Sequence, residues 1–163
     1  MELFIVRHGI AEEKSPGQSD DERRLTAEGR RETRFVARAL RRLDCRPQVI
    51  FSSPLPRAHE TAVILAKLLC PDEAVETSDF LTPMADSAAC IRWLHTLKQD
   101  SVMLVGHMPN LGGLVCKLLA RDALFDIVFK KAGCGCIVFE GPPAASRGRL
   151  QWLIQPDQLR ALR

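Results

Sequence analysis

The chain has 163 residues, of which 46% are hydrophobic and 26% are charged, and its net charge is +3. This length predicts one domain covering residues 1–163, and so small a charge gives no sign of a nucleic-acid or membrane partner. No apolar run approaches the roughly 18 residues of a transmembrane helix. The N-terminal residues lack the basic segment of a signal peptide, so the six cysteines are expected to be free thiols in a reducing cytoplasm.

The first half of the chain alternates apolar runs with segments of helical periodicity. Residues 2–6 predict the first strand, and the polar residues 8–25 predict a surface loop after it. A helix is expected over residues 26–43, because Thr26 is suited to its N-cap. Residues 48–52 predict the second strand, and Pro54 fits the first turn of a second helix that ends near Leu69.

The middle of the chain continues this alternation less clearly. Residues 74–78 predict a weak third strand, and residues 80–85 predict a loop. Asp86 or Ser87 is expected to begin a third helix that ends near Lys98.

The last third holds the most apolar strand, residues 101–106, and a helix that begins at Pro109–Asn110. Residues 133–140 and 149–154 then predict two late strands joined by a turn rich in Gly, Pro and Ser. Alternating strands and helices of this kind predict an α/β protein, a three-layer sandwich in which helices flank a mainly parallel sheet.

Polar residues follow three of the expected strands at the point where each strand ends. The first strand is followed by Arg7–Gly9, the second by Ser52–Arg57, and the most apolar strand by Gly106–Asn110. In an open α/β sheet, ligands bind beyond the carboxyl ends of the strands, where helix N-termini also favour anions. A lone histidine at a strand end is more often structural, but two histidines and two arginines placed in this way favour a functional site.

These side chains suit the transfer of a phosphoryl group. A neutral imidazole is a good nucleophile toward phosphorus, and His8 is the candidate. Arg7 and Arg57 can hold phosphate oxygens through paired hydrogen bonds, and both should disfavour protonation of His8. His107 can donate to the charge that develops on the equatorial oxygens. Gly9 lets the backbone approach the phosphate and can adopt a positive φ. Because the arginines supply positive charge, neither a metal nor another cofactor is expected.

The motifs together resemble the histidine phosphatase superfamily, which includes phosphoglycerate mutases and acid phosphatases. The resemblance rests on Arg7–Gly9, on Ser53–Ala62 and on Gly106–Pro109. It implies a phosphoglycerate mutase-like fold and a phosphohistidine intermediate on His8. By the same resemblance, Arg7, Arg57 and His107 would complete a pocket that binds phosphate or sulfate.

Within that superfamily, the chain is most similar to the short bacterial phosphohistidine phosphatases of SixA type, by its length and by Leu25–Thr26 and Leu81–Pro83. Many members of the superfamily that act on phosphate esters carry a catalytic carboxylic acid in the loop after the third strand. Here residues 79–86 hold no glutamate, and Asp86 is as well suited to cap a helix as to donate a proton. An alkoxide leaving group needs that proton, whereas protonated phosphohistidine expels neutral imidazole without it.

The sequence therefore predicts a phosphatase that removes the phosphoryl group from phosphohistidine on a protein partner. Two other functions stay open. A small phosphorylated molecule, a phosphate ester, is the substrate if Asp86 or a water supplies the proton. A non-catalytic phosphate-binding module is the alternative from another class, although the presence of both His8 and His107 counts against it.

Overall fold

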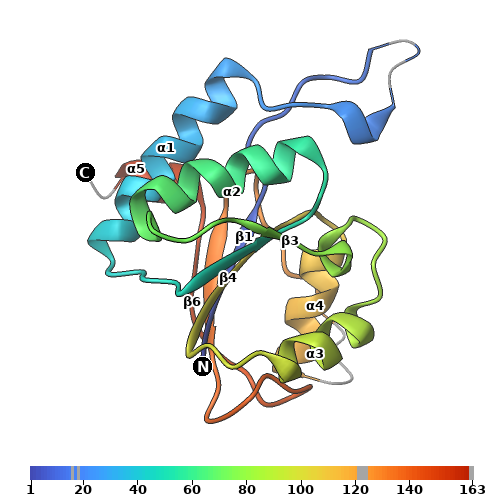
Figure 1. The fold of residues 1–163 in the computed structure, drawn as a ribbon, viewed down its shortest axis with the longest axis vertical. Helices are drawn as coiled ribbons and strands as arrows, with labels where there is room; N and C mark the ends of the chain where they lie inside the picture. The colour runs from blue at the N-terminus through green and yellow to red at the C-terminus, as the bar shows by residue number, and fades with distance from the viewer. Residues whose placement is uncertain (16, 18, 121–124, 162–163) are drawn as a thin grey trace.

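The structure, a computed structural model, describes residues 1–15, 17, 19–120 and 125–161. In these residues, six strands form one sheet of order β3-β2-β4-β1-β5-β6 (Figure 1). The parallel pairs are β3 with β2, β2 with β4, and β4 with β1, whereas β5 runs antiparallel to both β1 and β6. The bounds of the strands are β1 Glu2–Arg7, β2 Val49–Ser52, β3 Glu76–Thr77, β4 Ser101–Gly106, β5 Cys134–Val138 and β6 Arg149–Ile154.

Helices cover both faces of this sheet (Figure 1). One face packs against α1 (Ala27–Arg42), α2 (Pro56–Leu69) and α5 (Pro156–Ala161), and the other packs against α3 (Ser87–Thr96) and α4 (Asn110–Leu119). The prediction of a three-layer α/β sandwich with a mainly parallel sheet is thus confirmed. Among the described residues, none of the helices is long and apolar enough to cross a membrane.

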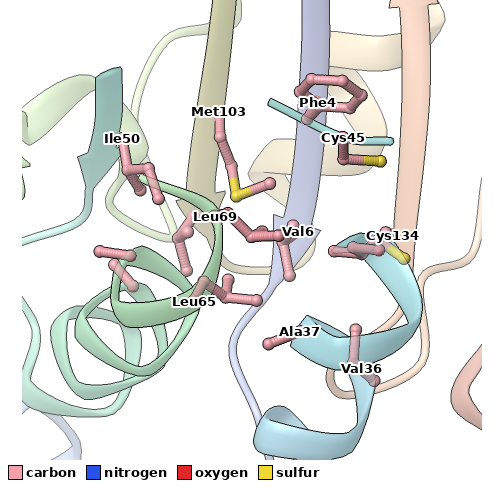
Figure 2. Packing of buried hydrophobic residues seen from close by; sticks show 14 of the residues in the cluster. Phe4, Val6, Val36, Ala37, Cys45, Ile50, Leu65, Leu69, Met103 and Cys134 are labelled. Atoms are coloured by element: carbon pink, nitrogen blue, oxygen red, sulfur yellow. The ribbon is translucent and has the colours of Figure 1, made fainter. Parts of the chain in front are cut away.

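The central strands are apolar along their middle residues because both of their faces are covered. Successive side chains of a strand point to opposite faces, so Phe4 and Val6 of β1 pack toward α1 and α2, whereas Leu3 and Ile5 pack toward α3 and α4. Figure 2 shows the first of these two cores, where side chains of the sheet meet those of the helices. Packing on both faces holds these strands in position, and it therefore also positions the loops that follow them and carry the polar motifs.

Five details differ from the sequence-based predictions. Helix α2 begins at Pro56 and not at Pro54, because a residue that precedes proline avoids helical angles and Leu55 is extended (φ −66°, ψ 134°). The third strand is reduced to Glu76–Thr77, and the short helix α5 has no counterpart in the predictions. The loop over residues 8–25, whose positions 16 and 18 lie outside the described residues, contains the 3-10 turn η1 (Asp20–Glu22). A second such turn, η2 (Asp79–Leu81), lies in the loop after β3.

Candidate active site

The sheet brings the three polar motifs to one edge. Strand β4 lies between β1 and β2, with Arg7 in register with Gly106 and Ser52 in register with Val105. The pairing continues one residue beyond the strands, since the His8 amide donates to the Gly106 carbonyl at 3.0 Å. As a result, the rings of His8 and His107 are neighbours, with their centroids 4.9 Å apart and their planes tilted by 51°.

His8 is buried and held in one orientation. Its Nδ1 lies 2.7 Å from the carbonyl oxygen of Gly9, and because a carbonyl only accepts, Nδ1 carries the proton and Nε2 keeps a free lone pair. The pKa of His8 is lowered to about 4, first by burial and then by the charges of Arg57, Arg7 and Lys131, against the opposing effect of the Gly9 carbonyl. The arginines therefore act in the predicted direction, but burial is the larger cause.

His107 is more deeply buried, with 2% of its surface exposed. Burial, followed by the proximity of His8 and Arg57, lowers its pKa to about 3. Neither of its ring nitrogens has a hydrogen-bond partner in the described part of the chain, and the same is true of Nε of Arg7. Buried polar atoms are nearly always hydrogen-bonded in folded proteins. Nε of Arg7 and the single N–H of the neutral His107 ring are therefore unpaired donors suited to an anionic ligand.

The two predicted arginines flank the histidines, and each lowers the pKa of both rings. Arg7 donates from Nη1 to the carbonyl of Phe129 at 2.6 Å, which ties β1 to the segment that precedes β5. Arg57, in the first turn of α2, donates from Nη1 to the Asp20 carbonyl at 2.6 Å and from Nη2 to Asp20 Oδ2 at 2.9 Å. The structure thus brings together all four side chains that were predicted to form the site.

Gly9 contributes in a different way from the one predicted. The described glycine with positive φ is Gly17, so the expectation of a positive φ at Gly9 is wrong. Its amide already donates to Oγ1 of Thr61 at 3.0 Å, and its carbonyl accepts from His8. A Cβ at this position would lie 2.6 Å from Oγ1 of Thr33 on α1, so glycine is needed here for close packing. Gly9 therefore orients His8, and its amide is not free to bind phosphate.

Asp86 caps helix α3. Its two carboxylate oxygens accept from the amides of Ala88 and Ala89 at 3.0 and 3.1 Å, and these hydrogen bonds lower its pKa. No hydrogen bond or ion pair among the described residues joins it to either histidine. The loop before it is held by Asn110, whose amide donates to the carbonyls of Phe80 and Thr82. This geometry favours the helix-cap interpretation of Asp86 over a catalytic one.

Three residues at the site were not predicted. Asp20 pairs with Arg57 and with Arg23, and Lys131 lies near enough to His8 to lower its pKa. Asp20 and Arg23 come from the loop predicted to be a plain surface segment, and Lys131 lies in the turn before β5. Neither periodicity nor a motif marks these positions. In the described ranges, no three His, Cys, Asp or Glu side chains group as a metal site requires.

Comparison with known proteins identifies the family. The model of the histidine phosphatase superfamily (branch 1) matches residues 3–82. An uncharacterized protein of Picosynechococcus sp. is 35% identical over 137 residues, which are 82% of each chain. The phosphohistidine phosphatase SixA homolog of Haemophilus influenzae is 30% identical over 132 residues, covering 74% of this chain and 79% of that protein.

Among solved structures, the protein histidine phosphatase SixA complexed with tungstate superposes with a TM-score of 0.86 at 26% identity, over 98% of this chain and 99% of its own. The family model spans His8 and Arg57, and the fold match covers 98% of the chain. The chain therefore belongs to the histidine phosphatase superfamily, in the group of SixA type, and it is a phosphatase.

Proposed function

We propose that this protein is a phosphohistidine protein phosphatase, a single domain that uses His8 as a covalent nucleophile. The observation that carries the proposal is the state of His8. It is buried, its pKa is lowered to about 4, and the Gly9 carbonyl holds the proton on Nδ1. A neutral imidazole with a free lone pair on Nε2 is the form that attacks phosphorus.

In the first step, Nε2 of His8 forms a bond to phosphorus while the bond between phosphorus and the imidazole of the substrate breaks. Arg7 and Arg57 hold the phosphoryl oxygens, and His107 donates to the charge that develops on them. The departing imidazole carries a proton on its other nitrogen and leaves as a neutral molecule. Water then attacks the phosphohistidine, which releases inorganic phosphate and restores His8.

The carboxylates near the site support phosphohistidine as the substrate class. Asp86 is engaged by the N-terminus of α3. Asp20 accepts from Arg23 and Arg57, and these interactions lower its pKa, so at neutral pH it is an anion with no proton to give. An alkoxide needs a proton from the enzyme in order to leave. The imidazole of a phosphohistidine that is already protonated on its ring does not. The names of the SixA relatives as phosphohistidine phosphatases support the same choice.

A substrate panel tests this proposal. Turnover of a phosphohistidine peptide, phosphoimidazole, an aryl phosphate and an alkyl phosphate should fall in step with the rising pKa of the leaving group. We expect kcat/KM for the alkyl phosphate to be lower than for phosphoimidazole by about 10²-fold or more, the scale of general-acid assistance. Comparable rates on both substrates would instead make the protein a phosphatase for small esters.

The covalent intermediate is tested separately. After incubation with ³²P-labelled substrate and a rapid quench, the protein should carry label that is stable to base and lost in acid. The variant His8→Ala should carry none, whereas His95→Ala, which alters an exposed histidine of α3, should be labelled like the wild type. Full turnover by His8→Ala would show that another residue is the nucleophile.

A further inference from the structure

The turn η1 places a carboxylate on the phosphate-binding arginine. Asp20 Oδ2 lies 2.9 Å from Nη2 of Arg57, and the Asp20 carbonyl accepts from Nη1 at 2.6 Å. The side chain of Arg57 is 4% exposed, whereas that of Asp20 is 48% exposed. The carboxylate therefore covers the arginine from the solvent side. Together with the Asp20 carbonyl, it occupies two donors that would otherwise serve a phosphate oxygen.

The carboxylate is held there from both sides. Its other oxygen, Oδ1, lies 2.7 Å from Nη1 of Arg23, which in turn donates from Nε to the Glu12 carbonyl. The turn itself is closed by a capping box, in which Ser19 accepts from the Asp21 amide and Glu22 accepts from the Ser19 amide. Asp20 is thus held by its own turn and by two guanidinium groups. Its contact with Arg57 is therefore part of the folded structure and not an incidental surface contact.

A phosphate that binds between His8 and Arg57 must either displace this carboxylate from Arg57 or bind beside it. Displacement breaks the hydrogen bond between the carboxylate and Nη2 of Arg57, and binding beside it places two anions close together. Both outcomes weaken the binding of a phosphate dianion. A phosphoimidazole group protonated on its ring carries a compensating positive charge, so a neighbouring carboxylate opposes it less.

We propose that Asp20 is a selectivity-determining residue, which weakens the binding of inorganic phosphate and of phosphate esters relative to protonated phosphoimidazole. The preference between substrates rests on the function proposed above, whereas the effect on inorganic phosphate does not. The consequence for turnover is that the product leaves readily. The same residue favours the substrate that brings its own positive charge.

The first arm of the test measures the affinity for inorganic phosphate by titration calorimetry, and it needs no catalysis. Asp20→Asn removes the charge but keeps the size of the side chain. Asp21→Asn is the matched control, because Asp21 lies in the same turn and its charge also acts on Arg57, but its side chain makes no hydrogen bond or ion pair in the part of the chain that is described. We expect phosphate to bind about tenfold more tightly to Asp20→Asn, a moderate effect because the carboxylate is half exposed, and within about twofold of wild type to Asp21→Asn.

Equal or weaker phosphate binding by Asp20→Asn would overturn the proposal, since Asp20 would then only orient Arg57. Asp20→Glu, which keeps the charge, should bind phosphate nearly as weakly as the wild type, and tight binding by this variant would also contradict the proposal. If thermal melting shows that Asp20→Asn is unfolded, Asp20→Ala replaces it in the comparison.

The second arm compares kcat/KM for an aryl phosphate and for phosphoimidazole. In Asp20→Asn, the ratio of the first to the second should rise about tenfold, and in Asp21→Asn it should stay as in the wild type. An unchanged ratio in Asp20→Asn overturns the claim of selectivity. If no form of the protein cleaves phosphoimidazole, the function proposed above fails, while the calorimetric arm still decides whether Asp20 competes with phosphate.

Discussion

The two buried histidines should make the stability of the ligand-free protein fall steeply as the pH falls below neutrality. In the folded state the pKa of His8 is about 4 and that of His107 is about 3, whereas an unfolded histidine titrates near a pKa of about 6.5. Between these values the unfolded chain binds protons that the folded chain does not, so folding becomes less favourable as the pH falls. The contribution of each histidine to the free energy of unfolding is present above a pH of about 6.5. As the pH falls, this contribution is lost progressively toward about pH 4 for His8 and about pH 3 for His107.

The size of the effect follows from the same pKa values. At about pH 5, protonation stabilises an unfolded histidine by about 2 kcal/mol, and it stabilises the folded form of either residue hardly at all. Each histidine therefore removes about 2 kcal/mol from the free energy of unfolding when the pH changes from about 7.5 to about 5. His107→Gln deletes one of these two contributions, because glutamine is polar but does not titrate. This variant should lose about 2 kcal/mol less than the wild type over the same pH change.

Urea unfolding in phosphate-free buffer at the two pH values measures this difference. The comparison is between pH values within one protein, so a uniform loss of stability caused by His107→Gln does not enter it. His95→Gln is the matched control and should behave as the wild type, because His95 is exposed on α3 and outside the site. If His107→Gln and the wild type lose the same stability with unchanged m-values, then His107 is not held neutral by burial, and the electrostatic account of the site is wrong.

Three further predictions follow from the site. Arg57→Ala should weaken the binding of vanadate or phosphate by about 1.5–3 kcal/mol, the value of a hydrogen bond to a charged group, and an unchanged affinity in calorimetry would mean that Arg57 does not contact the anion. Activity should persist in the presence of a strong chelator, because Arg7 and Arg57 supply the positive charge; loss of activity that one divalent ion restores would contradict this. Asp86→Asn should leave kcat/KM for phosphoimidazole nearly unchanged, because asparagine can also cap α3, and a fall of about 10²-fold or more on an alkyl phosphate would instead identify Asp86 as a general acid.

The sequence predicted the core of the site because local signals and topology agree there. His8 and His107 each follow a strand whose apolar character comes from burial on both faces, and such strands are recognised from composition alone. Parallel strands that meet at one edge then bring their carboxyl ends together, so proximity of the two histidines follows from the fold class. The rings are in fact neighbours, with centroids 4.9 Å apart.

The residues that the sequence did not reveal depend on contacts between distant parts of the chain. Asp20 reaches Arg57 across 37 positions, and its place is set by ion pairs and not by periodicity. Lys131 approaches His8 only because β5 pairs antiparallel with β1, which strand composition does not predict. Gly9 was assigned a backbone role from its residue type, whereas the reason for glycine there is the closeness of Thr33 on α1.

Burial and positive charge have separable roles in this site. The low pKa of His8 arises first from burial at the edge of the sheet, and the charges of Arg57 and Arg7 add to it less. Removal of Arg57 therefore leaves His8 neutral at pH 7, where even an exposed imidazole is mostly deprotonated. It follows that a loss of activity in Arg57→Ala reports weaker binding of the phosphoryl oxygens and not a change in the nucleophile. The sheet edge thus sets the protonation state of His8, whereas the arginines, opposed by Asp20, set how tightly the phosphoryl group is held.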